Sequence, residues 1–444
     1  MEESEMTKYS KIGKICDDFD LVQLKSVLIK NDAGDWGNEP DNNAIGIIRS
    51  TNFNNDGKLD LTNVAYRTLS VRKLEEKKLS VSDILIERSG GSETQPVGRV
   101  GYITEEIAKN DFAFANFIQR ISIDDTIDSK FIYYCLQHLY EMGITSGMQT
   151  QTTGIRNLDW KQYIGTYLPK PSLPEQASIA NILSKVDEAI ESVKKSIAAA
   201  EKLKKSLMQN LLTGRMKPDG TLRTEDEFYE DEKFGKVPIG WEVKAIGDKK
   251  VCQINPVYRY KRKEIYDFIP MEAVKERFGG LDYVEKQLID NSSYTRFKAG
   301  DILFAKITPC SENGKVAYIE HIDSDVGFAS TEFIVFHPTD EVNGYFIYIL
   351  LTSENIHRLA ISLMEGTTGR QRIPWKIFKN RIFVPLPGKE EQTDIVNRIL
   401  VFDKQINNYY NRINTLEILK KSLMQNLLTG KVRVGEVEIK GGKI

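Results

Sequence analysis

The stretch KKSLMQNLLTG occurs twice in this chain, at Lys204–Gly214 and again at Lys420–Gly430. The two copies start 216 residues apart, close to half of the 444 residues, so internal duplication is the first possibility to test. At the same offset no gap is needed from Leu168 to Gly214, and Glu175-Gln176 falls on Glu391-Gln392. The chain is therefore two diverged copies of one unit.

Upstream of Leu168 the register between the copies drifts by a residue or two, yet short stretches still match. TTGIRNLDWKQY at Thr152 matches TTGRQRIPWKIF at Thr367, and SDILIERS at Ser82 matches GDILFAKI at Gly300. Such small drifts indicate insertions in loops. Each copy thus has a variable front part and a better-matched back part.

The back part of each copy has the pattern of a long helix. After Pro174 no Gly or Pro occurs before Gly214, and the composition favours helix. Apolar residues recur in alternating steps of four and three, the heptad pattern of a coiled coil, and the one polar residue in each stripe is Lys204 or Lys420. A first-turn Pro and the terminal Gly214 and Gly430 fit the expected start and stops. A helix of a compact bundle is the alternative to two antiparallel coiled-coil helices.

The front parts mix short β-rich runs, such as AIGIIRS and DILFAKI, with amphipathic helical runs. We therefore predict the α+β class: two tandem globular α/β domains, separated by two long antiparallel coiled-coil helices and related as a pseudo-twofold internal repeat. The predicted boundaries are residues 1–170 for the first domain, 171–215 for the first helix, 216–236 for a linker, 237–387 for the second domain, 388–430 for the second helix and 431–444 for a tail.

Composition excludes several classes of protein. No apolar run approaches the roughly 20 residues of a membrane span, and the polar start MEESEMTKYSKIGK is unlike a signal peptide, so we expect a cytoplasmic protein. Cys16, Cys135, Cys252 and Cys310 are scattered, which predicts neither disulfides nor a zinc site. Since the net charge is −2, a nucleic-acid partner would require a local cluster of cations.

The sequence has no complete catalytic motif. Asn255–Tyr258 resembles the Asn-Pro-Pro-Tyr signature of amino-methyltransferases but lacks the second Pro and a Gly-x-Gly loop, so a turn at a strand end is expected. The carboxylates and lysine within Asp219–Lys233 partly fit a nuclease pattern but lie in the linker. Glu312–Val316 lacks the first Gly and the Ser/Thr of a P-loop. We predict that the chain alone is not an enzyme.

Local clusters do suit nucleic acid. Tyr258–Lys263 interleaves cations with aromatics, as phosphate contact plus base stacking would require, although a solvated loop is equally consistent. A polar loop precedes the Trp in both copies, and Gln, Asn and Arg pair bidentately with base edges in the major groove. The predicted DNA-binding residues are Arg49, Asn52, Arg88, Gln149, Gln151, Arg156, Asn157, Lys161, Tyr258, Arg259, Tyr260, Lys261, Arg262, Lys263, Lys306, Lys315, Arg370, Gln371, Arg372 and Lys376.

The junctions LPKPSLPEQ and VPLPGKEEQ, the heptad helices, KKSLMQNLLTG and the TTG-to-Trp stretches resemble the specificity subunit of type I restriction-modification enzymes over nearly the whole chain. The resemblance implies two target recognition domains, each reading one half of a split DNA sequence, and helices that set their spacing. It also implies two bound modification (methyltransferase) subunits and two restriction (translocase-nuclease) subunits, with S-adenosylmethionine, ATP and Mg²⁺ on those partners and no cofactor or metal in this chain.

On this interpretation the eleven residues recur because each of two partner copies needs the same docking surface. The predicted docking residues are Lys205, Met208, Gln209, Leu212, Lys421, Met424, Gln425 and Leu428. Two alternatives remain open. The chain could be a coiled-coil scaffold that binds protein without recognising DNA, or a fused restriction enzyme, against which the missing cofactor motifs argue.

Overall fold

The computed structural model describes residues 8–92, 95–152, 155–290, 293–367 and 369–434. The chain forms two compact units. The first unit combines residues 1–194 with 411–444, and the second unit is the continuous stretch 195–410. Each unit therefore takes a segment of both long helices, whereas the domains predicted from the sequence followed one another along the chain.

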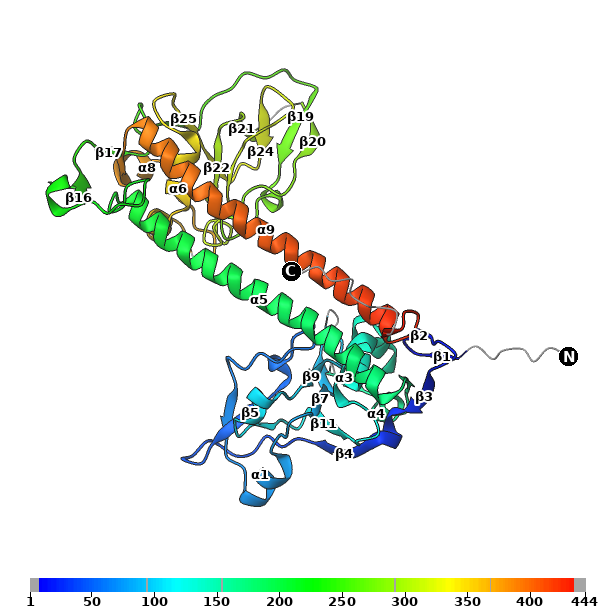
Figure 1. Cartoon of the computed structure of the whole chain (residues 1–444). Coiled ribbons are helices and arrows are strands. Elements are labelled where there is room, and N and C mark those ends of the chain that lie inside the picture. The colour runs from blue at the N-terminus through cyan, green and yellow to red at the C-terminus, as the bar shows by residue number, and fades with distance from the viewer. Residues whose placement is uncertain (1–7, 93–94, 153–154, 291–292, 368, 435–444) are drawn as a thin grey trace. The chain divides into compact units, whose positions relative to one another are not determined.

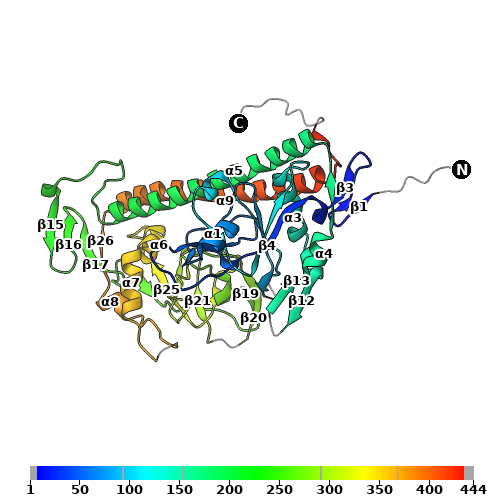
Figure 2. The same ribbon diagram turned by 90° about the horizontal axis from the view of Figure 1, so that it is seen from below.

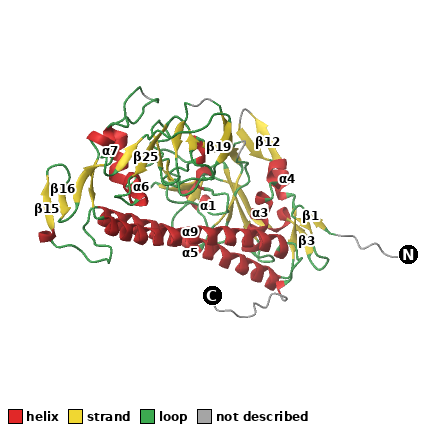
Figure 3. Ribbon diagram, turned by 90° about the horizontal axis from the view of Figure 1, so that it is seen from above, coloured by secondary structure: helices red, strands yellow, loops and turns green. Residues whose placement is uncertain are grey.

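The two long helices are α5 (Leu173–Leu212) and α9 (Lys389–Leu427), which confirms the predicted helical back parts. Their heptad stripes are turned inward: Ile179 and Leu183 of α5, and Ile395 of α9, are fully buried. Within each unit the segments of α5 and α9 lie side by side (Figure 1, Figure 3). Among the described residues, no helix is both long and apolar enough to cross a membrane.

In the second unit the contacts between α5 and α9 show that the two helix segments run antiparallel. Lys204 of α5 forms an ion pair with Asp403 of α9. The Tyr410 hydroxyl, further along α9, donates a hydrogen bond of 3.0 Å to Glu201 Oε1, which precedes Lys204 on α5. Rising residue numbers on one helix thus meet falling numbers on the other.

The same order holds in the first unit. Lys420 Nζ of α9 lies 2.8 Å from Asp187 Oδ1 of α5. Arg433, just beyond α9, forms two hydrogen bonds of 2.8 Å with the Glu175 carboxylate near the start of α5. The predicted antiparallel pairing is therefore confirmed separately in each unit.

Around these helix segments, each unit builds small sheets. The strands of the first unit are β1 (Tyr9–Ser10), β2 (Gly13–Lys14), β3 (Asp20–Gln23), β4 (Leu28–Ala33), β5 (Ile45–Ile48), β6 (Ala65–Arg67), β7 (Ile84–Glu87), β8 (Ser89–Gly91), β9 (Val100–Tyr102), β10 (Ala113–Phe114), β11 (Ile118–Ile123), β12 (Gln149–Thr152), β13 (Ile155–Leu158) and β14 (Tyr167–Lys170). Its shorter helices are η1 (Leu24–Val27), η2 (Ser50–Asn52), α1 (Val71–Lys77), α2 (Glu105–Ala108), α3 (Ser129–Glu141), η3 (Ile144–Met148) and α4 (Trp160–Ile164).

The second unit has a corresponding set of elements. Its strands are β15 (Phe228–Asp231), β16 (Gly235–Pro238), β17 (Glu242–Ala245), β18 (Cys252–Ile254), β19 (Glu264–Ile269), β20 (Glu285–Ile289), β21 (Thr295–Phe297), β22 (Ile302–Ala305), β23 (Val316–Tyr318), β24 (Gly327–Ala329), β25 (Phe333–Pro338) and β26 (Phe383–Leu386). Its shorter helices are η4 (Glu225–Glu227), η5 (Met271–Ala273), α6 (Gly344–Thr352), α7 (Glu354–Ser362) and α8 (Ile377–Asn380).

The main sheets of the two units share one topology. The first unit has the antiparallel order β4-β11-β7-β9, and the second has β18-β25-β22-β23. Helix α3 packs beside β9 (Figure 1), and α6 packs beside β23 in the same way. A further sheet, β10-β5-β6 in one unit and β20-β19-β24-β21 in the other, contains a parallel pair in both cases. This matching confirms the internal repeat at the level of the fold.

The repeated KKSLMQNLLTG segments complete the hydrophobic cores. Leu211 and Leu212, from the first copy, belong to the core of the second unit together with Trp241. Leu427 and Leu428, from the second copy, belong to the core of the first unit, next to the N-terminal strands. Burial of such side chains stabilises a fold by roughly 1.5–3 kcal/mol each. Each copy is therefore needed by the core of one unit.

The glycines that end the two copies also allow a close approach. Gly430 has φ +72°, and a Cβ there would lie 2.9 Å from atoms of Cys16 and Phe19. Gly214 has φ +69°, and a Cβ there would lie 2.2 Å from Pro238 Cγ. Glycine is required at both positions because the backbone is left-handed and the neighbouring chain leaves no room for a side chain.

Candidate nucleic-acid interface and helix surface

In the first unit the predicted DNA-binding loop is part of the sheet β12-β13-β8, seen beyond α4 in Figure 2. The backbone register pairs Gln151 with Arg156, while Thr153 and Gly154 lie outside the described residues. Ser89 Oγ of β8 lies 2.6 Å from Asn157 Oδ1 of β13. The hairpin is thus held at its base by β8, with Arg156 half-buried.

A polar network adjoins this hairpin. Arg88 Nη1 donates to Gln119 Oε1 at 3.2 Å, and Gln119 Nε2 donates to Asn31 Oδ1 at 2.7 Å. Trp160 Nε1 also donates to Asn31 Oδ1 at 3.1 Å, and the Arg88 guanidinium lies 5.6 Å from the Trp160 ring centre. Gln119 is only 4% exposed, so within this network it positions Arg88, whose guanidinium is the group suited to a guanine edge. Gln119 and Asn31 were not predicted, and the polar Gln119 within the buried strand IQRISI was the available signal.

The second unit places different side chains at the corresponding positions. Ile373 N donates to Lys306 O at 2.8 Å, just as Leu158 N donates to Arg88 O at 2.8 Å. Leu158 and Ile373 are therefore equivalent. Gln371, two residues before Ile373, occupies the position that Arg156 has before Leu158. Arg370, which the sequence analysis placed in the matching loop, is exposed one residue earlier. Thr368 lies outside the described residues.

The neighbouring cations of the second unit already have partners. Arg372 forms hydrogen bonds of 3.0 and 2.9 Å with both carboxylate oxygens of Glu332. The Arg372 side chain lowers the pKa of Glu332, against the opposing effect of burial. Lys306 Nζ donates to Thr331 O at 2.7 Å. Arg372 and Lys306 can therefore contact DNA in two ways. They either keep their present partners while they do so, or they break these hydrogen bonds first.

Several predicted DNA-binding residues have structural roles instead. Asn52 is 2% exposed, and its side chain donates to Asp60 O and Asn63 O at 2.8 and 3.1 Å. Its prediction is wrong because the amide holds a turn. Arg49 is half-buried with Nε lacking a hydrogen-bond partner, and Gln149 has its Oε1 buried without one, among the described residues.

Lys315 also stabilises a turn. Its Nζ donates to Met271 O at 3.0 Å, at the start of η5. In the first unit Arg99 occupies the matching place, donating to Ser50 O at 3.0 Å at the start of η2. Arg99 also forms a bidentate pair with the buried Glu87, whose pKa burial raises. Because the Lys315 ammonium is bonded inside the second unit, the prediction of Lys315 as a DNA contact is not supported.

In the segment Tyr258–Lys263 the tyrosines are half-buried and the cations are exposed. The Tyr258 hydroxyl donates to the carboxylate of Asp301, and the Tyr260 ring packs on Phe328 with 5.1 Å between ring centres. Both rings are thus held against the protein and only half-exposed, so their stacking on bases stays a prediction. The remaining predicted residues that are exposed are Arg259, Lys261, Arg262, Lys263, Lys161 and Lys376.

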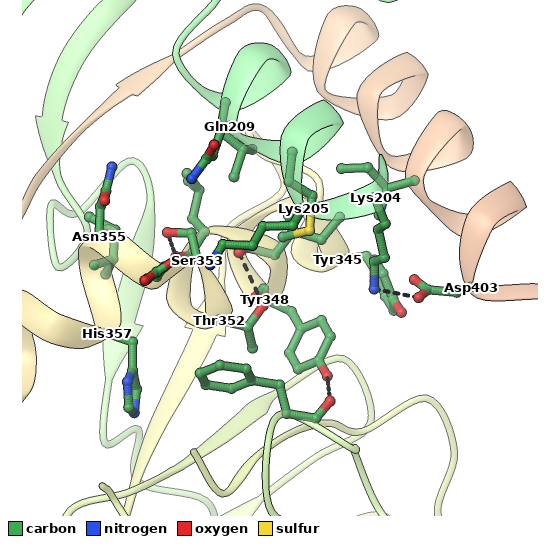
Figure 4. Close-up of a pocket in the computed structure, with 18 of the residues that line it drawn as sticks. Lys204, Lys205, Gln209, Tyr345, Tyr348, Thr352, Ser353, Asn355, His357 and Asp403 are labelled. Atoms are coloured by element: carbon green, nitrogen blue, oxygen red, sulfur yellow. Dashed lines mark hydrogen bonds and ion pairs between the residues drawn. The ribbon is translucent and has the colours of Figure 1, made fainter. Parts of the chain in front are cut away.

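The first copy of the repeated segment lines a groove of about 800 Å³ inside the second unit (Figure 4). Lys205 and Gln209 project from α5 into this groove, whereas Lys204 is bonded to Asp403 of α9. Lys205 Nζ lies 2.5 Å from Glu354 Oε2 on α7, and burial lowers the pKa of His357 in the same wall. The exposed, predicted docking residues Lys205 and Gln209 thus face a real concavity.

Three of the predicted docking residues are buried in a core. Met424 and Leu428 are fully buried, and Leu212 is 7% exposed, so a partner protein cannot reach them. Met208 is half-buried against the core of the second unit. Lys421 and Gln425 are exposed, and Gln425 Oε1 lies 3.2 Å from His138 Nε2.

The helices expose other apolar side chains, which the sequence analysis missed. Leu203 is 56% exposed and Leu419 is 44% exposed. Both directly precede the repeated segment, so they occupy equivalent positions in the two copies. Two equivalent exposed leucines beside exposed lysines suit a repeated contact with a partner.

Comparison with known proteins agrees with this architecture. The chain matches the family described as the type I restriction modification DNA specificity domain twice, over residues 17–202 and 238–417. It therefore belongs to this family. The putative type I restriction enzyme MjaX specificity subunit of Methanocaldococcus jannaschii is 25% identical, with 96% of each chain covered. The EcoAI specificity subunit of Escherichia coli is 34% identical over 39% of this chain and 29% of its own length.

Solved structures support the same fold. The crystal structure of the S subunit of a type I restriction-modification system from M. genitalium superposes with a TM-score of 0.52 at 15% identity, covering 95% of this chain and 99% of that one. A structure of a type I restriction-modification system, solved for complex assembly and conformational transition, has a TM-score of 0.52 at 13% identity, with 94% and 100% covered. At these identities the likeness concerns the fold alone.

Proposed function

We propose that this chain is the DNA-recognition subunit of a type I restriction-modification complex, in which each unit reads one half of a two-part DNA sequence. The single observation that carries this is the double family match, one for each copy of the repeat. Two copies of a DNA-recognition domain on one chain can bind two DNA sequences at the same time. An interrupted target sequence is the simplest substrate for such a protein.

The two units are expected to read different half-sites. The first presents the hairpin with Arg156 and the network of Arg88 and Gln119. The second has Gln371 at the position of Arg156 and an exposed Arg370. Because Arg favours guanine and Gln favours adenine in the major groove, a shared frame with exchanged side chains changes the sequence that is read.

Two modification (methyltransferase) subunits are the proposed partners of the long helices, with two restriction subunits joining through them. The exposed Leu203 and Leu419, at equivalent positions, support two equivalent contacts. S-adenosylmethionine, ATP and Mg²⁺ would then be carried by those partners, and this chain would contribute recognition and no bond-making step.

The test is to express the chain with its modification subunit in cells that lack other adenine methylation, and to map methylated adenines by sequencing. We expect one interrupted motif that disappears when the chain is omitted. The purified chain with S-adenosylmethionine alone should not methylate DNA. Methylation by the chain alone, or a motif that persists without it, would contradict the proposal. A protein scaffold without DNA recognition would show no salt-dependent DNA affinity.

A further inference from the structure

Between β18 and β19 of the second unit, residues 255–263 form neither helix nor strand, yet their backbone is fixed at both ends. Asn255 has φ +51°, and its Oδ1 accepts a hydrogen bond of 3.0 Å from Val335 N. Lys263 has φ +63°, and its amide donates to Ile289 O at 2.7 Å. Positive φ is uncommon for lysine, whereas asparagine tolerates it, and the hydrogen bonds at both ends hold the segment in this conformation.

The first inward side chain of this segment is Tyr258, which is bound to a buried carboxylate. The Tyr258 hydroxyl lies 3.0 and 3.2 Å from the two carboxylate oxygens of Asp301, whose side chain is fully buried. Asp301 also accepts from Lys298 N at 2.8 Å and contacts His337 Nδ1 at 2.7 Å. Three groups thus bond to one buried carboxylate, and the carboxylate that they hold in place fixes the position of Tyr258.

The second inward side chain is Tyr260, which is held by packing. Its ring lies 5.1 Å from that of Phe328 and 6.4 Å from that of Tyr266, both edge-on. The Arg296 guanidinium lies 4.6 Å from the centre of the Tyr260 ring and donates to Tyr258 O at 2.8 Å. The segment therefore has two inward-facing anchors that are two residues apart.

With both tyrosines turned inward, the cations of this stretch face the solvent. We name the four exposed residues Arg259, Lys261, Arg262 and Lys263 the basic segment. Lys261 Nζ lies 3.8 Å from Glu264 Oε1 in a solvent-exposed pair, which is worth little. No ion pair involves the other three side chains within the described residues. A rigid frame that presents several unpaired cations loses little entropy when it binds anions.

The first unit has no such feature at the corresponding place. Its edge strand β4 is followed by Gly34–Asn43, which contains Asp35, Glu39 and Asp41 and no cation. Asp35 pairs with Lys73, and Asp41 accepts from Thr68, so these carboxylates are occupied by local contacts. At this position in the fold the described residues form a cationic surface in the second unit and none in the first.

We infer that the basic segment binds consecutive phosphate groups of the DNA strand next to the half-site read by the second unit, and that Asp301, through Tyr258, is the residue that positions it. The inference rests on the proposed function and adds a sequence-independent contact to one side of the recognition complex. Lys and Arg side chains supply the charge that neutralises phosphates, and an unchanged methylated motif distinguishes this contact from base reading by the same residues.

The experiment uses the complex of the chain with its modification subunit and a fluorescent duplex that contains the mapped target. DNA affinity is measured by anisotropy between 50 and 200 mM salt for R259Q/R262Q and for the matched control K249Q/K250Q, whose lysines are exposed elsewhere in the second unit. Loss of two phosphate contacts should reduce the slope of log K against log salt by roughly 2. The control should keep the wild-type slope, and both should methylate the same motif.

The positioning role is tested with Y258F, which keeps the ring and removes the hydroxyl, against Y102F in the first unit, whose hydroxyl bonds to Ser82 at 3.1 Å. Y258F should reduce the salt slope, and Y102F should leave it at the wild-type value. If R259Q/R262Q keeps the wild-type slope of log K against log salt, the inference is overturned. This holds also if the variant binds a protein partner less tightly, because the basic segment then contacts protein and not DNA. A wild-type complex without salt-dependent DNA binding refutes the proposed function itself, which is a separate result.

Discussion

Lys420 Nζ of α9 lies 2.8 Å from Asp187 Oδ1 of α5, and the side chains are only 8% and 17% exposed. Lys420 also lies 5.9 Å from the Tyr134 ring centre, and the Tyr134 hydroxyl donates to Asp187 Oδ2 at 2.8 Å. The equivalent pair of the other copy, Lys204 with Asp403, is less buried. The single polar residue in each heptad stripe is thus one half of an ion pair, which selects one register of the helix segments in each unit.

Removing the charge of Asp187 should therefore destabilise the first unit. D187N leaves Lys420 buried without its counter-ion, which typically costs about 3–5 kcal/mol. D403N should cost only about 1 kcal/mol, because Lys204 can reach solvent. Urea unfolding monitored by circular dichroism compares the two variants. Equal shifts of the two midpoints would contradict a role for burial.

Substituting the exposed leucines should weaken partner binding without affecting the fold. L203E and L419E each remove one apolar contact, so each should lower the number of modification subunits bound per chain, and the double variant should lower it further. Analytical ultracentrifugation of the reconstituted complex measures this stoichiometry. L222E is the control, since Leu222 is 67% exposed but lies off both long helices. Full binding by the double variant would place the docking surface elsewhere.

Stability should fall as the pH is lowered from about 7.5 to 5.5. Burial lowers the pKa of His138, against the opposing hydrogen bond with Gln425, and burial also lowers the pKa of His357. The folded state thus prefers neutral imidazole, while the unfolded chain takes up protons below a pKa of about 6.5. Stability is fully present above that value and is lost below it.

This pH dependence can be assigned by substitution. H138Q and H357Q should each reduce the loss of urea midpoint between pH 7.5 and 5.5. H321Q is the matched control, because the His321 side chain is 82% exposed. A pH dependence that neither buried-site variant alters would show that other groups cause it.

Arg156 and Gln371 should act on different half-sites. R156A should relax recognition at one base pair of one half by about 1–3 kcal/mol, and Q371A should do so in the other half. Sequencing of methylated adenines would show which positions become degenerate. Relaxation of the same half by both variants would contradict one reader per unit.

The parts of the fold that could be predicted are those with a local signal. The heptads of α5 and α9 are periodic over about forty residues, so their helices and their pairing followed from the sequence. The segments that make up the first unit could not be predicted, because the unit depends on Leu428 packing against residues near the N-terminus. Leu428 fits a docking surface and a core equally well until its neighbours are known.

The candidate site shows the same limit. Alternation in Tyr258–Lys263 indicates two faces but does not say which is buried, and the answer depends on Asp301, distant in sequence. Asn52 carries a side chain that suits base reading, yet the same amide suits a turn. Polar side chains reveal a possible chemistry, and only the tertiary fold decides whether it is directed inward or outward.

The order in which the two units fold follows from the segments that make up each unit. The second unit is continuous, so a ribosome delivers all of its residues in succession. The first unit begins at the N-terminus but needs Met424, Leu427 and Leu428 to fill its core. At usual elongation rates its first 194 residues wait roughly 10 to 50 s for that last segment. The segment before Lys194 is therefore made earlier than the second unit yet finishes folding later, and a stop codon before Met424 leaves the core of the first unit incomplete.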